Sequence, residues 1–406
     1  MVESPAALQP PVQMRRDAFD PVPELAEIRD SVGVQTVVNA FGLPAYLVTR
    51  HDDVKAMLSD HERFSNVRPP GFVAVPGGPD EDEQARSRAG NLLALDPPEH
   101  QRLRRMLTGE FTTRRMKLLQ PHIADIVDAQ LDAMAAAGPP VDLVANFALP
   151  IPSLVICELL GVPYADREDF QRRSGRQLDL SIPIPERLAL VRAGRDYMTG
   201  LVADARRSPG DDLLGMLVRE HGTELTDDEL VGIASLLLIA GHETTSNMLG
   251  LGTLALLRHP EQLAAVRDDP DAVGPAVEEL LRWLSIVHTT IPRFTTTDVE
   301  VAGVRIPAGR LVFASLPAAN RDPVLLDDPD RLDIGRGAMG HVAFGHGVHH
   351  CLGAPLARME MRIALPALLR RFPGLELAED FDDVEFRSFH FIYGLRALSV
   401  RWAEAR

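Results

Sequence analysis

The feature that most constrains the fold is a long helical segment in the second half of the chain. The sequence TDDE places Thr226 and Glu229 in a capping box, and no proline follows until Pro260. The segment therefore has room for more than thirty helical residues. At ~1.5 Å per residue such a helix is roughly 50 Å long, enough to cross a whole domain. Apolar residues surround much of its middle, so the sequence predicts that it is buried.

The centre of this predicted helix is polar. It reads AGHETTSN over 240–247 and includes the ionisable Glu243. Buried polar groups cost free energy unless they are paired or serve the function of the protein. Two interpretations are open at this point, a hydrogen-bonded cluster or kink within the core and a functional site.

The rest of the chain is dominated by amphipathic helical patterns. Apolar residues recur at three- and four-residue spacing, which predicts further helices over 121–137, 149–161 and 185–207. Strand-like runs are few and short, and they lie at 35–41, 45–50, 299–316, 374–377 and 395–402. These patterns predict a mainly α fold that carries a small β region.

Composition and charge limit the class of protein. The 406 residues are 45% hydrophobic and 25% charged, as in an ordinary globular protein, and no linker of biased composition divides them. We therefore expect one domain over 1–406, with residues 1–20 as an extended or flexible N-terminus. Lys and Arg total 42 against 58 Asp and Glu, a formal net charge of -16, which disfavours a nucleic-acid partner.

The sequence also bears on where the protein works. The N-terminus has no basic segment followed by an apolar one, so it does not read as a signal peptide. The most apolar stretch, 231–241, is shorter than the ~20 residues that a membrane-spanning helix needs. Cys157 and Cys351 are far apart and predict no disulfide framework. We expect a cytoplasmic monomer that does not associate with membranes.

The surroundings of Cys351 are unusual for a cysteine that merely fills space. The loop AFGHGVHHCLG places glycines at 345, 347 and 353, and a predicted helix begins directly after it. Glycines let backbone N–H groups turn toward a sulfur, and a helix N-terminus favours a thiolate, which is a good metal ligand. Two alternatives stay open on these grounds, a small apolar core residue and a zinc site that uses the neighbouring histidines.

The loop resembles that of a known family. FGHGVHHCLG (344–353) matches every fixed position of F-G-x-G-x-[HR]-x-C-x-G, the haem-ligand loop of the cytochrome P-450 family. The resemblance implies the fold of that family, with the long central helix over a haem and a small antiparallel sheet. It also implies that Cys351 is the axial thiolate ligand of the iron in haem b (iron protoporphyrin IX).

Other motifs of the family follow in the expected order. EELLR (278–282) matches E-x-x-R, so the resemblance implies a structural pair of Glu279 and Arg282, with Arg321 as a candidate third member. LDPPEHQRLRRML (95–107) is similar to the helix that opens after the substrate loop, for which we expect Asp96 as the N-cap. By the same resemblance, the ligands of the haem propionates are His100, Arg104, Arg293 and His349.

The polar centre of the long helix takes a role from the resemblance. AGHETT (240–245) matches the oxygen-activation motif [AG]-G-x-[DE]-T-T. We expect the Thr244 hydroxyl to bond back to the carbonyl of Ala240, which would spoil a helical hydrogen bond and open a groove over the iron. Thr244 and Glu243 are then the catalytic candidates, with Thr244 holding a water by hydrogen bonds and Glu243 relaying protons from solvent.

The implied reaction is a monooxygenation. One oxygen atom of O2 enters a lipophilic small molecule by hydroxylation or epoxidation, and the other leaves as water. No flavin or nicotinamide fingerprint follows a strand, so the reductase is expected to be a separate protein. The resemblance to soluble bacterial members of the family implies that ferredoxin and an NAD(P)H-linked ferredoxin reductase deliver the electrons. A basic patch suited to an acidic ferredoxin is predicted at Arg102, Arg105, Arg114 and Arg115.

Substrate choice is the least readable property. The wording of the motifs is most similar to members from actinobacterial secondary metabolism, which implies a bulky lipophilic substrate. Candidate pocket residues are Leu236, Ala240, Ile291 and Ile392. Two rival functions stay open, a haem enzyme that uses peroxide and a non-catalytic haem protein that senses or carries a gas. The presence of Glu243 and Thr244 argues against the peroxide-using class.

Overall fold

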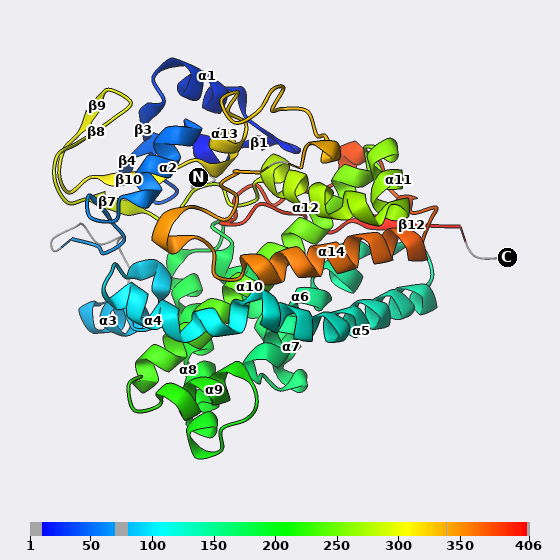
Figure 1. Ribbon diagram of the computed structural model, residues 1–406, viewed down its shortest axis with the longest axis horizontal. Coiled ribbons are helices and arrows are strands. Elements are labelled where there is room, and N and C mark those ends of the chain that lie inside the picture. The colour runs from blue at the N-terminus through cyan, green and yellow to red at the C-terminus, as the bar shows by residue number, and fades with distance from the viewer. Residues whose placement is uncertain (1–9, 70–79, 338, 404–406) are drawn as a thin grey trace, which may run out of the picture.

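Helices form most of the molecule and most of the strands gather at one side. The computed structural model describes residues 10–69, 80–337 and 339–403. In Figure 1 the early and late strands, drawn in blue and yellow, lie together, and the helices fill the rest of the view. The predicted mainly α fold with a small β region is confirmed. Residues 1–9 of the predicted N-terminal segment lie outside the described residues. Residues 70–79, which belong to the loop before α4 (Glu99–Thr108) that resembles the substrate loop of the family, also lie outside them.

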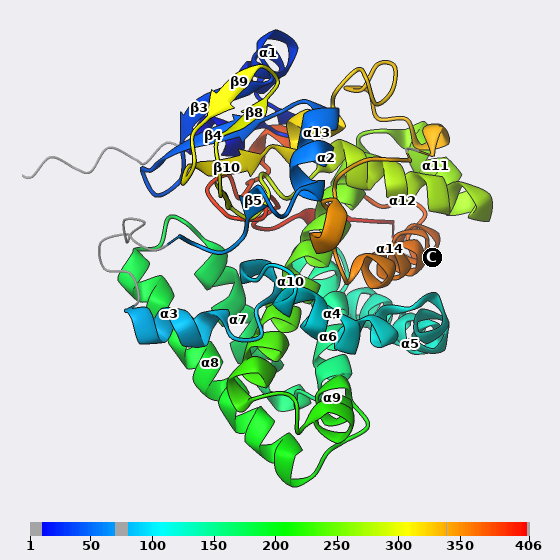
Figure 2. The same cartoon turned by 60° about the vertical axis from the view of Figure 1, so that its left-hand side comes forward.

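The predicted central helix is present as α10, Asp227–Leu257. It begins at the predicted capping box, in which Thr226 accepts from the N–H of Glu229 and the Glu229 carboxylate accepts from the N–H of Thr226. It packs against α6 (Pro150–Leu160), α8 (Ile184–Arg207) and α14 (Ala354–Arg371), and in Figure 2 it passes through the middle of the molecule. Most of its residues belong to the largest hydrophobic core or are buried beside it.

The other predicted helices are also found, with shifted ends. The segment 121–137 lies within α5, Thr113–Ala137, which begins earlier because the Thr112 side chain caps it by accepting from Arg115 N–H. The segments 149–161 and 185–207 match α6 and α8. Further helices are α1 (Pro23–Ser31), α2 (His51–Ser59), α3 (Glu81–Arg88), α4 (Glu99–Thr108), α7 (Arg167–Leu178), α9 (Leu213–His221), α11 (Pro260–Asp268), α12 (Pro270–Leu284) and α13 (Leu316–Asn320).

Within the described residues, the strands form one five-stranded sheet and three smaller ones. The large sheet has the order β3-β4-β10-β7-β5, made of Val34–Val38, Pro44–Val48, Leu311–Ala314, Arg293–Thr295 and Phe64–Ser65. The smaller sheets are β11-β12-β6 (Glu376–Leu377, Ser399–Arg401, Val141–Asp142), β8-β9 (Val299–Val301, Val304–Ile306) and β1-β2 (Arg16–Asp17, Asp20–Pro21).

The described strand pairings are antiparallel, as expected, except for one. Strands β4 and β10 run parallel, with Val312 opposite Tyr46 and Ala314 opposite Val48. Parallel neighbours need a long crossover connection between them. Helices α2 to α12 lie between these two strands in sequence, so this condition is met.

The described part of the N-terminal segment is packed onto the protein rather than flexible. Residues 10–20 include the 3-10 helix Val12–Met14 and strand β1. Phe19 is buried, with its ring 5.1 Å from that of Trp283 and 5.9 Å from that of Phe381. Within the described ranges, no helix is both long enough and apolar enough to cross a membrane.

Candidate functional site

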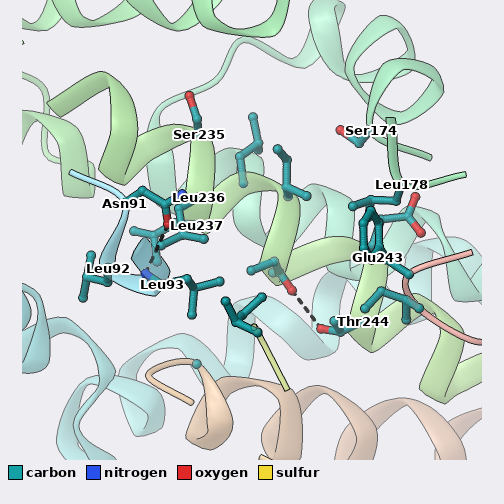
Figure 3. A pocket seen from close by; sticks show the side chains of 18 of the residues that line it. Asn91, Leu92, Leu93, Ser174, Leu178, Ser235, Leu236, Leu237, Glu243 and Thr244 are labelled. Atoms are coloured by element: carbon teal, nitrogen blue, oxygen red, sulfur yellow. Dashed lines mark hydrogen bonds between the residues drawn. The ribbon is translucent and has the colours of Figure 1, made fainter. Parts of the chain in front are cut away.

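A single cavity of about 1180 Å³ lies against the middle of α10. Its wall includes α4, α7, α8, the loop 286–293 and the loop that leads into α14. Figure 3 shows Glu243, Thr244 and Ser174 toward one side of this cavity and Ser235 toward the other. Every site residue predicted from the sequence lines this space, namely His100, Arg104, Leu236, Ala240, Glu243, Thr244, Ile291, Arg293, His349, Cys351 and Ile392.

Cys351 is held by a loop of glycines at the start of α14. Gly345 and Gly347 have φ values of +70° and +71°, and a Cβ at Gly347 would lie 2.5 Å from the backbone oxygen of Leu58. Only glycine fits that position without strain. The loop closes through Cys351 N–H, which donates to the Phe344 carbonyl at 2.9 Å, and presents the sulfur to the cavity.

The electrostatics around Cys351 suit a thiolate that has a positive partner. Burial raises the pKa of the thiol above its ordinary value, while the backbone N–H groups of Gly353 and Ala354 and the guanidinium of Arg104 act in the opposite direction. A bound cation would complete the stabilisation of the thiolate.

Four basic side chains line the cavity on the same side as Cys351. The rings of His100 and His349 lie 4.2 Å apart, and among the described residues neither ring has a hydrogen-bond partner for its nitrogens. Burial, together with the nearby cations, lowers the pKa of His100 to about 4 and that of His349 to about 3. Burial also lowers the pKa of Arg293 to about 10. Positive charges on these four side chains repel one another, so a ligand with two negative charges would stabilise them.

These donors fit haem b. Its two propionates would accept from the unpartnered ring nitrogens of His100 and His349 and from Arg104 and Arg293, and its iron would take the sulfur of Cys351. A zinc site does not fit as well. Within the described part of the chain, no three His, Cys, Asp or Glu side chains are arranged to hold a metal ion.

Asp96 does not cap α4 as expected. The helix begins at Glu99 with Pro98 at the N-cap, and no side chain caps it. The Asp96 carboxylate instead accepts from the N–H of Asn66 at 2.9 Å and from the hydroxyl of Ser65. The carboxylate therefore ties the segment after β5 to the start of α4, which keeps His100 beside the cavity.

The hydroxyl of Thr244 donates to the Ala240 carbonyl at 2.8 Å, as the motif predicts. The helix nevertheless continues through this point, because α10 is one uninterrupted helix from Asp227 to Leu257. A hydroxyl that shares a carbonyl with the helical N–H bends a helix rather than breaking it. The groove that was expected over the iron is therefore not present as a break in α10.

Glu243 lies in a charged cluster that sequence reasoning missed. Its side chain is only 3% exposed and its carboxylate is 3.3 Å from Nη1 of Arg387. The ring of His242 lies 3.6 Å away on the other side, and Asn247 Nδ2 donates to it at 3.4 Å. Arg387 is 144 residues further along the chain, and no local spacing signal identifies it as the partner.

The E-x-x-R pair is present and fully buried. Arg282 makes two hydrogen bonds to the Glu279 carboxylate, at 2.7 and 2.8 Å, and both side chains are 0% exposed. The proposal of Arg321 as third member is wrong. Its guanidinium bonds Asp20, Asp330 and the carbonyl of Trp283, because the N-terminal strands pack over it.

Two of the four arginines of the predicted basic patch are paired with carboxylates. Arg102 is paired with Glu229 and Arg115 with Glu110. Arg105 and Arg114 are exposed and have no ion pair with any described residue.

Comparison with known proteins places the chain in a family. The family model described as Cytochrome P-450 matches residues 201–380. The chain is 52% identical to Cytochrome P-450 FAS1 of Rhodococcoides fascians, over 97% of this chain and 98% of that one. It is 44% identical to pentalenic acid synthase of Streptomyces avermitilis, over 99% and 100% of the two chains.

A solved structure shows the same fold. The crystal structure of CYP105P1 in complex with filipin I superposes with a TM-score of 0.90 at 40% identity. The match covers 98% of this chain and 100% of that one.

Proposed function

Because the chain belongs to the cytochrome P-450 family and is a haem b monooxygenase, we propose that it hydroxylates or epoxidises a lipophilic secondary metabolite. The single observation that carries the proposal is that Cys351, the four basic residues beside it and Thr244 all line one cavity. Haem supplies the oxygen chemistry, in which O2, two electrons and two protons yield one inserted oxygen atom and one water. The protein supplies binding, orientation and the path of the protons.

The roles of the polar residues on α10 follow from their positions. Thr244 lines the cavity and its hydroxyl oxygen can still accept a hydrogen bond, so it would hold a water in place. Glu243 also lines the cavity, its carboxylate contacts Arg387, and it is the carboxylate through which protons would enter. The two neighbours would therefore connect the cavity with the charged cluster of His242, Glu243 and Arg387.

The cavity supports a lipophilic substrate. Leu236, Ala240, Ile291 and Ile392 line it and give it an apolar wall near Thr244. Relatives with 43–44% identity are named pentalenic acid synthase and vitamin D3 dihydroxylase, and both names point to bulky apolar molecules. The volume of the cavity that haem would leave free is consistent with a substrate of similar size.

We expect the electrons to come from a ferredoxin and its NAD(P)H-linked reductase. Arg105 and Arg114 are exposed on α4 and at the start of α5, close to the haem-binding residues of α4. These two cations can attract an acidic partner even though Arg102 and Arg115 are neutralised. A cytoplasmic monomer of one domain remains our expectation.

The proposal is tested by turnover under isotopically labelled O2. A library of lipophilic compounds is first screened for loss of the iron's water ligand, and the best binder is incubated with NAD(P)H, ferredoxin, reductase and ¹⁸O2. Incorporation of one labelled atom into the product supports the proposal. Equal turnover with hydrogen peroxide alone would favour the peroxide-using class, and a stable oxygen complex without NAD(P)H consumption would favour a gas-binding protein.

A further inference from the structure

One face of helix α7 lines the cavity, and the cationic side chain of Arg173 lies in the middle of that face. Phe170, Arg173, Ser174, Gln177 and Leu178 all line the cavity, and their spacing of three and four residues defines a single helical stripe. A charged residue within an inward-facing stripe breaks the usual division between apolar and polar faces. Such breaks are expected at functional positions rather than structural ones.

The guanidinium of Arg173 is held in place but not neutralised. It lies over the ring of Tyr197, 5.4 Å from the ring centre, and the Tyr197 hydroxyl donates to Asp166 at 2.8 Å, which fixes the ring. The Nε atom of Arg173 is buried and, among the described residues, has neither a hydrogen-bond partner nor a carboxylate in an ion pair. An arginine stacked on a ring keeps its N–H edge free for an acceptor.

Neighbouring arginines on α7 show the contrast. Arg172 is paired with Asp169 and Arg176 with Glu186, and both point away from the cavity into solvent. At the rim of the cavity, Arg192 is paired with Glu83, and on the inner side Arg195 is paired with Asp228. Each of these cations has a carboxylate. Arg173 is the one on α7 that faces the cavity and lacks one.

Helix α7 packs against the segment of α10 that carries His242 and Glu243. The Phe170 ring packs edge-on against that of His242, with centres 4.7 Å apart. A Cβ at Gly175 would lie 3.2 Å from Oε1 of Glu243. These two contacts seat α7 on the segment of α10 that carries Glu243 and Thr244, and Arg173 lies between them in sequence.

A second donor on the cavity wall also lacks a partner. The Ser235 hydroxyl is buried and has no hydrogen bond to any described residue, whereas Thr244 and Thr253 on the same helix bond back to carbonyls four residues earlier. Figure 3 shows Ser235 toward the side of the pocket away from Thr244. Unmet donors of this kind lower stability unless a ligand accepts from them.

From this geometry we propose that the substrate carries an anionic group, a carboxylate or a phosphate, which binds the Arg173 guanidinium. Its apolar body then extends toward Leu236 and Ala240 and places the carbon to be oxidised near Thr244. An anion supplies the counter-charge that no described side chain gives to Arg173. This inference rests on the proposed monooxygenase function, because it assumes that the cavity is the substrate site.

The test compares matched ligands in binding to the haem-loaded protein, measured by isothermal titration calorimetry. The probes are dodecanoic acid, dodecyl phosphate and the neutral methyl dodecanoate. We expect one or both anions to bind the wild type about tenfold or more tightly than the ester. Arg173→Gln should remove that preference and leave ester binding unchanged. Arg172→Gln, a change on the outward face of the same turn, should keep it.

Three results would overturn the inference: equal binding of anions and ester by the wild type, an anion preference that survives Arg173→Gln, and no binding of either anion. The order of the two anions decides between carboxylate and phosphate. Failure of the monooxygenase proposal is seen separately, because the same preparation would then incorporate no labelled atom from ¹⁸O2 into a product. Calorimetry does not depend on that chemistry.

Discussion

The carboxylate of Glu243 lies 3.3 Å from a guanidinium nitrogen of Arg387 and joins the middle of α10 to a segment near the C-terminus. Burial by itself raises the pKa of this carboxyl, but the contacts with His242 and the charges of Arg387 and His390 outweigh it and lower the pKa to about 2. Glu243 is therefore ionised near neutral pH. A proton that passes through it must arrive while the ion pair is loosened.

Removing Arg387 should destabilise the protein. Arg387→Gln leaves a buried carboxylate without its counter-charge, and we expect the free energy of unfolding to fall by about 3 kcal/mol at pH 7. The pKa of Glu243 is depressed in the folded state, so its contribution is present above its ordinary pKa of 4.5 and is lost as the pH falls toward 2. Urea denaturation of the haem-loaded protein across this range measures both effects.

The double variant is the control. Arg387→Gln combined with Glu243→Gln removes both charges and should recover part of the lost stability. Equal destabilisation by the single and the double variant would show that the ion pair does not account for the effect.

Thr244→Ala should separate electron use from product formation. The variant lacks the hydroxyl that we propose to hold a water over the reaction site, so product per NAD(P)H should fall about tenfold or more while hydrogen peroxide rises. Thr244→Ser keeps a hydroxyl and should restore most of the coupling. Haem content and substrate affinity are measured alongside, and unchanged coupling in the alanine variant would contradict the assigned role.

The two cysteines provide a matched pair. Cys351→Ser should lose the red-shifted Soret band of the reduced carbon monoxide adduct, because the band requires a thiolate ligand. Cys157→Ser alters a cysteine that is 3% exposed within α6 and outside the cavity lining, and it should keep the band. A normal spectrum for the Cys351 variant would rule out its role as the axial ligand.

His288 should make the protein sensitive to acid. Its ring is 2% exposed and neither nitrogen has a hydrogen-bond partner among the described residues, and burial lowers its pKa well below 6.5. The unfolded chain takes up a proton below pH 6.5 and the folded one does not, so stability falls as the pH drops from 6.5. The slope from this group is about 1.4 kcal/mol per pH unit.

Replacing that ring isolates its contribution. His288→Leu should flatten the loss of stability between pH 6 and pH 4 by about that slope, as measured by urea midpoints. An unchanged slope would show that His288 is protonated in the folded protein or that other groups dominate.

Sequence reasoning reached the site because its signals are local. The glycine loop around Cys351, the motif with Glu243 and Thr244 and the pair of His100 and Arg104 each lie within one turn or loop, so their spacing alone implies which side chains share a face. The long helix was predictable for the same reason, since a capping box and the next proline set its two ends.

Long-range pairings could not be read in this way. Asp96 was expected to cap a helix but bonds to Ser65 and Asn66, and Arg321 was expected near Glu279 but pairs with Asp20 and Asp330. In both cases the partner lies on a segment that the sequence gives no means of placing. A polar side chain that could form hydrogen bonds or ion pairs with several partners pairs with the one that packing places beside it.

The sequence by itself determined the helical character, the buried central helix and the candidate residues for holding haem, because these were read from hydrophobic period, caps and motifs that resemble those of a known family. Only the tertiary structure decided that Arg387 neutralises Glu243 and that Arg173 faces the cavity without a carboxylate. Charge pairing falls off over a few ångströms, so it depends on which distant segments come into contact, and that is settled by packing of the whole chain.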